Sequence, residues 1–178
     1  MGLEDFVLSP LTSDFDLRKF DCGNSDINEF LKEDALNYQQ HHLANTFLFC
    51  NDLSEVVAFF CISNDCLNKK LENGIWNKFH RKQSIPNDKR IRQYPAIKIG
   101  RLGVDKKFQK SGIAYELMDF IKGYAILDLK PACRLLLLDA YNQPRQLNYY
   151  DKNGFIFLHE NDLEEPTRIM YFDMKKFD

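Results

Sequence analysis

The sequence has 178 residues, with 24 basic and 26 acidic side chains, and hydrophobic residues make up 44% of it. This length predicts a single domain over residues 1–178, and no apolar run approaches the roughly 18 residues that a membrane-spanning helix requires. A net charge of −2 argues against a protein that coats nucleic acid by bulk charge.

The cysteines and the first residues indicate a compartment. Five cysteines, an odd number without Cys-x-x-Cys spacing, predict reduced thiols rather than a disulfide framework or a zinc site. The stretch MGLEDFVLSP has no basic region followed by an apolar one, so we expect neither an export signal nor a lipid anchor. A cytoplasmic protein without a metal centre fits these features best.

The first third of the chain predicts a strand, a helix and a hairpin. Residues 6–11 form a candidate strand, and CGNSDINEFLKEDALNYQQ then places apolar side chains on one face at helical spacing. Asn24 or Ser25 is suited to cap this helix. Residues 46–50 and 56–63, separated by the turn-forming stretch Asn51-Asp52-Leu53-Ser54, predict an antiparallel hairpin.

A basic insertion follows at residues 66–93. Its acidic residues are Glu72 and Asp88, against the basic residues Lys69, Lys70, Lys78, Arg81, Lys82, Lys89, Arg90 and Arg92. We expect a short helix around 74–81 and a loop around Pro86-Asn87-Asp88. The insertion is either a solvated segment that carries its own solubility or a surface that contacts phosphates.

The second half predicts alternating strands and helices. In AIKIGRLGV the apolar alternation changes parity, which a one-residue bulge at Gly100-Arg101 would restore. A helix over 113–125, the buried strand RLLLLDAY, a short helix from Pro144 and two closing strands at 155–159 and 168–174 follow. This order predicts a mixed α/β sheet.

The turn between the bulged strand and the following helix is the candidate site. It reads Gln109-Lys110-Ser111-Gly112-Ile113-Ala114. The opening turn of a helix presents backbone N–H groups without an intrahelical partner, and the helix dipole adds positive charge there. Gly112 removes the β-carbon that would keep a phosphate at a distance, and Gln109 and Lys110 supply further donors. The turn therefore predicts a pyrophosphate site.

These residues resemble the signature of the GNAT superfamily of acetyl-coenzyme A-dependent acetyltransferases. That signature is Gln or Arg, two residues, Gly, one residue, then Gly or Ala, after a strand that ends in Val, here Val104. A second signature, Tyr-x-x-x-Gly-Phe, is matched by Tyr150 to Phe155. The resemblance covers Phe6 to Tyr171. It implies a mixed, mostly antiparallel central sheet with a splayed parallel pair and flanking helices.

The resemblance also implies how acetyl-CoA is held. The pantetheine arm would pair with backbone groups of Leu102, Gly103 and Val104, and the pyrophosphate would lie on residues 109–114. The cofactor-contacting asparagine of the family falls on Gln143 here, with Asn142 beside it. Because Ala often stands where this chain has Gly103, we expect Gly103→Ala to be mild.

A ternary complex with direct attack by an amine is the mechanism that the resemblance implies. A backbone N–H near Leu102 would polarise the thioester carbonyl, and Tyr150 would donate a proton or hydrogen bond to the coenzyme sulfur. Adjacent helical residues point about 100° apart, so Tyr149 is the rival of Tyr150 for this role. The general base stays unassigned.

Three functions remain open at this point. The main interpretation is an N-acetyltransferase that acts on a primary amine. The alternative is the toxin of a toxin-antitoxin pair that acetylates aminoacyl-tRNA, because RLGVD at 101–105 resembles the RLAVD of that branch; an antitoxin would then be a partner. The third is a non-catalytic module that binds coenzyme A or a protein. The resemblance is compatible with a homodimer, which no residue pattern establishes.

Overall fold

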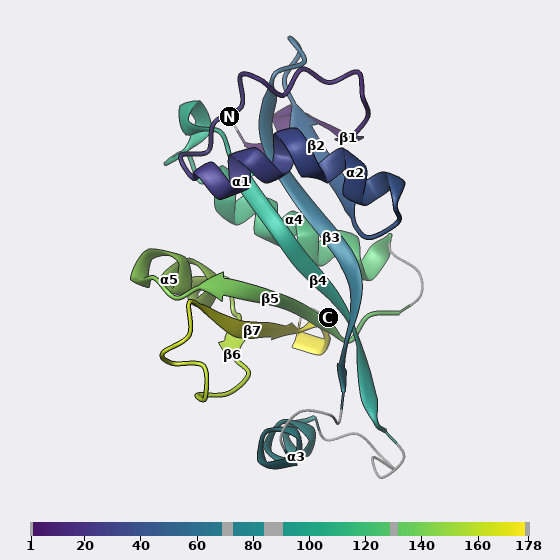
Figure 1. The fold of residues 1–178 in the computed structure, drawn as a ribbon, viewed down its shortest axis with the longest axis vertical. Coiled ribbons are helices and arrows are strands. Elements are labelled where there is room, and N and C mark those ends of the chain that lie inside the picture. The colour runs from purple at the N-terminus through teal and green to yellow at the C-terminus, as the bar shows by residue number, and fades with distance from the viewer. Residues whose placement is uncertain (1, 69–72, 84–90, 129–131, 177–178) are drawn as a thin grey trace. The chain divides into compact units, whose positions relative to one another are not determined.

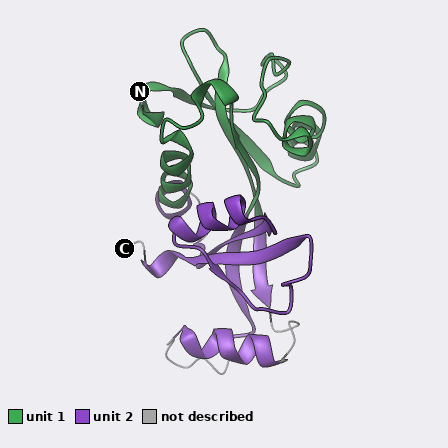
Figure 2. Ribbon diagram, turned by 90° about the vertical axis from the view of Figure 1, so that its left-hand side faces the viewer, with its two compact units in different colours: residues 1–63, 99–123 green, residues 64–98, 124–178 purple. Residues whose placement is uncertain are grey.

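The computed structural model describes residues 2–68, 73–83, 91–128 and 132–176. The chain divides into two compact units (Figure 2). Unit 1 comprises residues 1–63 and 99–123, and unit 2 comprises residues 64–98 and 124–178. Neither unit is one continuous stretch of chain. The single domain over 1–178 stays a prediction.

The strands form a sheet with the hydrogen-bonded order β1-β2-β3-β4-β5-β7-β6 (Figure 1). Its strands are β1 (Val7–Pro10), β2 (Asn45–Cys50), β3 (Val56–Asn68), β4 (Gln93–Val104), β5 (Leu135–Tyr141), β6 (Ile156–Phe157) and β7 (Thr167–Asp173). The described ladders are antiparallel except for β4 with β5, which pair in parallel from Ala96↔Leu135 to Lys98↔Leu137. The predicted mixed, mostly antiparallel sheet is confirmed.

Unit 1 holds the first hairpin and the predicted amphipathic helix. That helix consists of α1 (Ser25–Glu29), a π-helical turn (Phe30–Asp34) and α2 (Ala35–Gln40). Asn24 caps it, because its side chain accepts a hydrogen bond from the Ile27 N–H at 3.3 Å. The helix buries its apolar face in a core that includes Leu11, Phe20, Phe30, Leu31, Ala35, Leu48, Val56 and Phe59.

Unit 2 is built on β5 and β7. Residues 135–138 of β5 are buried, and α3 (Asn73–Lys82) packs Trp76 and Phe79 into a core shared with Tyr94 and Tyr171. Helix α5 (Pro144–Lys152) begins at Pro144 as predicted. The Arg134 guanidinium ties the start of β5 to Asp173 at 2.9 Å.

The remaining predicted helices, strands and loops can be compared with the structure. Helix α4 (Ile113–Leu127) and the short helix of the insertion form as predicted, and β3 extends to Asn68, beyond the expected end at residue 63. Short 3₁₀ turns cover Leu3–Asp5, Lys106–Phe108 and Met174–Lys176. The expected loop at 86–88 lies outside the described residues. The bulge at Gly100-Arg101 stays a prediction. Within the described part of the chain, no helix has the length and apolarity needed to cross a membrane.

Candidate functional site: the turn before helix α4

Asp105 fixes the end of β4 just before the turn. Its buried carboxylate accepts hydrogen bonds from the N–H groups of Asp21 at 3.0 Å and Lys107 at 2.9 Å. Its own N–H donates to the Val57 carbonyl at 2.8 Å. These donors satisfy the oxygens of a carboxylate that is buried away from water. The chain therefore leaves the strand in one defined direction.

Gln109 holds the turn through its side chain. Its amide nitrogen donates to the Cys22 carbonyl at 2.8 Å and to the Val104 carbonyl at 2.9 Å. We name this contact the Gln109 strap. The amide nitrogen expected to face a phosphate thus binds two protein carbonyls instead, so this side chain shapes the turn from within unit 1.

Two residues of the turn have left-handed backbones. Lys110 has φ +66° and Gly112 has φ +97°, and a side chain at φ +97° would be strained. The Ser111 hydroxyl donates to the Phe108 carbonyl at 2.6 Å. Successive N–H groups in such a turn converge and form a concave anion-binding surface.

Helix α4 begins directly at this turn. The N–H groups of Tyr115 and Glu116 donate to the Gly112 carbonyl at 2.9 and 3.3 Å. Ile113 is fully buried and anchors the first turn of the helix in unit 1, whereas Ala114 is partly exposed. Six predicted residues, 109–114, are thus brought together at the positive end of a 15-residue helix.

Glu116 is a residue of this site that the sequence reasoning missed. Its carboxylate accepts a hydrogen bond from the Leu3 N–H. A β-carbon placed on Gly112 would lie 3.8 Å from its Oε1. A carboxylate in the first helical turn stabilises the positive end of the helix. The Glu116 carboxylate would also repel a second negative charge placed at Gly112. The signal was an acidic residue in the first turn of α4.

The end of β4 is packed more tightly than expected. A β-carbon on Gly103 would lie 3.0 Å from Phe59 Cε1, 3.3 Å from Cys22 Cβ and 3.3 Å from Ile27 Cγ2. Val104 is buried, and Leu102 is partly exposed. This packing argues against the expectation that Gly103→Ala is mild, because the added carbon would lie close to three neighbours from three segments.

We expect Gly103→Ala to destabilise the protein by about 1–3 kcal/mol through overpacking. Urea unfolding followed by circular dichroism measures this change. The matched control is Gly100→Ala in the same strand, where the added carbon meets the nearest Cys61 atoms at an ordinary 3.8 Å. Equal midpoints for both variants would contradict the packing argument.

Tyr150 lies on α5 in unit 2. Its ring contacts Tyr149 and Phe155 at centroid distances of 5.1 and 5.9 Å. Burial around the hydroxyl, with a smaller contribution from Tyr141, raises the pKa of Tyr150 to about 12. The phenol therefore keeps its proton at neutral pH. A hydrogen bond joins the two ends of the second motif, because the Phe155 N–H donates to the Tyr150 carbonyl at 3.0 Å.

Asn142 serves the loop that precedes β7. Its side-chain nitrogen donates to the carbonyls of Leu163 at 2.7 Å and Glu165 at 2.9 Å. Its backbone N–H donates to the Pro166 carbonyl at 2.9 Å. These donors are engaged within unit 2, so a cofactor contact from Asn142 would fall to its oxygens.

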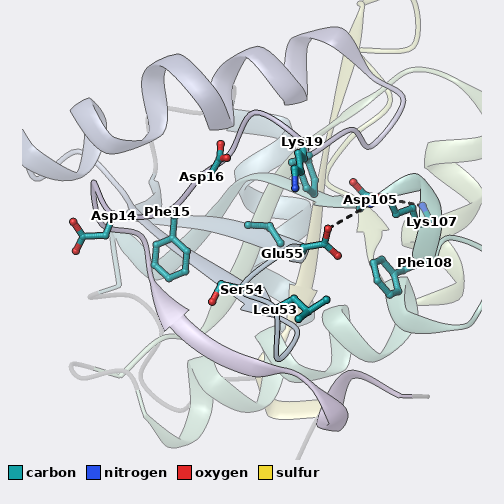
Figure 3. Close-up of a pocket in the computed structure, with 12 residues that line it drawn as sticks. Asp14, Phe15, Asp16, Lys19, Leu53, Ser54, Glu55, Asp105, Lys107 and Phe108 are labelled. Atoms are coloured by element: carbon teal, nitrogen blue, oxygen red, sulfur yellow. Dashed lines mark hydrogen bonds and ion pairs between the residues drawn. The ribbon is translucent and has the colours of Figure 1, made fainter.

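A pocket of about 390 Å³ in unit 1 lies beside the segment that leads into the turn (Figure 3). Asp105, Lys107 and Phe108 line it together with Asp14, Phe15, Asp16, Lys19, Phe20, Leu53, Ser54, Glu55 and Val56. The Glu55 carboxylate stands 3.9 Å from Lys107 Nζ. The carboxylates that line this pocket would repel a phosphate, and none of the residues 109–114 is among its lining residues. The pocket is thus separate from the turn.

The sheet order, the parallel β4–β5 pair and the turn that opens α4 define the GNAT fold. No protein-family profile matches the sequence. Solved structures share the fold over 97% of this chain. They include AtaT complexed with acetyl-methionyl-tRNAfMet (TM-score 0.71, 20% identity, 97% of that chain) and AtaTR bound with AcCoA (0.71, 22%, 96%). A tyrosine-to-phenylalanine mutant of KacT is another (0.71, 18%, 96%).

Proposed function

We propose that this protein is an acetyl-CoA-dependent N-acetyltransferase that transfers the acetyl group to a primary amine within a ternary complex. The observation that carries the proposal is the turn at 109–114, where two residues with left-handed backbones directly precede the positive end of α4. The shared fold supports it, because AtaTR with that fold has been solved with AcCoA bound.

In this proposal the cofactor is held mainly by backbone. The pyrophosphate binds the N–H groups of residues 110–114, with the Lys110 ammonium as an added charge. The pantetheine amides pair with Leu102, Gly103 and Val104 as an added strand would. Gln109 acts as a positioning residue through its strap to Cys22 and Val104, and Asn142 contributes through oxygen atoms.

The chemical step places different demands on the protein. The amine nitrogen attacks the thioester carbon and loses one proton, the carbon–sulfur bond breaks with its electrons leaving on sulfur, and the sulfur gains a proton, so that an amide and a thiol result. We assign Tyr150 as the group that donates a hydrogen bond or proton to this sulfur, because its pKa of about 12 keeps it protonated. The order of the two motifs in the sequence supports assigning the turn and Tyr150 to one cofactor.

We further propose that the acceptor is the amino group of an aminoacyl-tRNA and that the protein acts as a toxin in the cytoplasm. Two structures with this fold support the finer assignment, namely AtaT complexed with acetyl-methionyl-tRNAfMet and the AtaT mutant toxin bound to the C-terminus of the antitoxin AtaR. The RLGVD stretch and the basic insertion agree with it. An antitoxin is then a partner.

Acetyl-CoA turnover with a panel of acceptors tests both the proposed acetyltransferase activity and the proposed aminoacyl-tRNA acceptor. We expect thiol release with charged tRNA and little release with uncharged tRNA, free amino acids or a lysine peptide. Release with small amines alone would leave an acetyltransferase and overturn the tRNA acceptor. Tight acetyl-CoA binding without release on any acceptor would overturn the enzyme and support a coenzyme A-binding module.

Induced expression gives the physiological counterpart. We expect the wild-type protein to arrest growth and Tyr150→Phe at equal abundance to leave growth unimpaired. Optical density and immunoblotting measure the two quantities. Growth that is unimpaired by both forms at high abundance would contradict the toxin assignment.

A further inference from the structure

A groove in unit 2 combines cationic and aromatic side chains and shares no lining residue with the turn. It has a volume of about 340 Å³ and lies between α3 and the β6–β7 hairpin. Its lining residues are Lys78, Phe79, Lys82, Phe157, Leu158, His159, Glu160, Leu163, Arg168 and Tyr171. We name it the α3 groove.

One wall of the α3 groove carries two lysine side chains. Lys78 and Lys82 lie one turn apart on α3 and both are exposed. Burial of Phe79 on the same helix, against Tyr94 and Tyr171, fixes which face of α3 these lysines occupy. Within the described ranges neither lysine has an ion pair, and both side chains line the groove.

The opposite wall is an ordered aromatic platform. The Arg168 guanidinium lies 3.8 Å over the Phe157 ring. A buried ion pair with Asp162 at 3.1 Å and a hydrogen bond to the His159 carbonyl at 3.2 Å hold that guanidinium in place. Asp162 also accepts the Ile169 N–H at 2.8 Å. The wall is therefore set before any ligand arrives, which lowers the entropic cost of binding.

The wall also leaves apolar surface exposed. Phe157 is 38% exposed and Leu163 is 53% exposed. The Arg168 charge is balanced by Asp162, so the net attraction comes from the two lysines. Glu160 is the remaining carboxylate in the lining. Cationic groups on one wall and a flat apolar group on the other match the phosphate and the base of a nucleotide, respectively.

We propose that the α3 groove binds a single-stranded segment of RNA, with phosphates on Lys78 and Lys82 and a base against Phe157 and Leu163. This deepens the proposed function, on which it rests, by naming where the tRNA is held apart from its reacting amino group. It also reconciles an acidic chain with an RNA ligand, because affinity then depends on a local pair of charges rather than on net charge.

The test is the binding of uncharged tRNA, which has no amino group to acetylate. Fluorescence anisotropy gives the Kd for the wild type and for Lys78→Ala/Lys82→Ala between 50 and 200 mM salt. We expect weaker binding and a slope of log K against log salt that is shallower by roughly 1.4, because two phosphate contacts are lost. The matched control is Lys175→Ala/Lys176→Ala, which removes the same charge from an exposed site of unit 2 outside the groove.

The contact between Phe157 and a base is tested by a second pair of variants, one at Phe157 and a control at Ile156. Ile156 and Phe157 are adjacent in β6 and equally exposed at 38%, but successive residues of a strand face opposite ways, and Phe157 is the one that lines the groove. We expect Phe157→Ala to weaken binding roughly 5- to 100-fold without changing the salt slope. Ile156→Ala should leave Kd unchanged. Phe157→Leu, which keeps an apolar side chain but removes the ring, serves if the alanine variant fails to fold.

The outcomes separate the two proposals. Lysine variants that bind like their control would overturn the groove, even if charged tRNA is acetylated. Failure of acetyl transfer together with both expected binding losses would retain the groove and overturn the enzyme. Loss with the lysines but not with Phe157 would overturn the base contact, because the groove would then hold only the phosphate backbone of the tRNA. Acetyl-CoA affinity should be the same in every groove variant.

Discussion

Gly112→Asp should abolish measurable acetyl-CoA binding while helix α4 still forms. The new carboxylate would lie at the opening of the helix, where aspartate is a favoured cap and accepts the N–H groups that the pyrophosphate needs. It would also face the Glu116 carboxylate, because a β-carbon on Gly112 lies 3.8 Å from Glu116 Oε1. Each lost charged hydrogen bond costs about 1.5–3 kcal/mol, so a Kd increase of roughly 100-fold or more is expected.

Isothermal titration calorimetry measures this loss, and Gly112→Ala is its control. Alanine has the same backbone strain at φ +97° but adds no charge. We expect a smaller weakening for alanine, with both variants retaining helical circular dichroism. Unchanged acetyl-CoA affinity in Gly112→Asp would show that the cofactor does not bind this turn.

Tyr150→Phe should lower kcat by roughly 10²- to 10⁴-fold, the range for loss of a general acid or base, and leave the Kd for acetyl-CoA nearly unchanged. The change removes one hydroxyl and keeps the ring contacts with Tyr149 and Phe155. The sulfur would then depart without a donor. Steady-state kinetics on charged tRNA, with calorimetry for binding, separates the two quantities.

Tyr149→Phe is the matched control, since it removes the hydroxyl of the neighbouring ring. We expect near wild-type kcat; a larger loss at Tyr149 than at Tyr150 would reverse the assignment. Because the pKa of Tyr150 is raised to about 12, we also expect its titration to cause no change in kcat near neutral pH. Its contribution to stability is fully present below its unfolded pKa near 10 and is lost as pH rises through about 12.

Local chemistry made much of the fold predictable. Asn24 was a suitable cap by residue type alone, and its side chain does accept the Ile27 N–H. Pro144 likewise began α5 as its fixed φ favours. The apolar run of β5 indicated burial, and residues 135–138 are buried. These features depend on neighbours within a few residues, which a single sequence displays.

Long-range contacts were beyond such reasoning. The Gln109 amide meets Cys22, 87 residues earlier, and nothing near Gln109 names that partner. The cost of a side chain at Gly103 depends on Phe59 and Ile27, which come from other elements. The π-helical turn at Phe30–Asp34 was not predicted, and the apolar face after it differs from regular helical spacing: Leu36 packs against the core and Tyr38 is 42% exposed. The sequence shows Glu116 as an acidic residue of the first helical turn, but it does not show the contact with Leu3.

The Gln109 strap gives a reason for the residues that the signature accepts at its first position. The side chain must satisfy two carbonyl oxygens at once, those of Cys22 and Val104. Glutamine and arginine both end in a rigid planar group with several N–H bonds, whereas glutamate offers only acceptors. The chemistry required at this position is therefore a divergent pair of donors that joins two chain segments, which allows a neutral and a cationic side chain of different length to replace one another there.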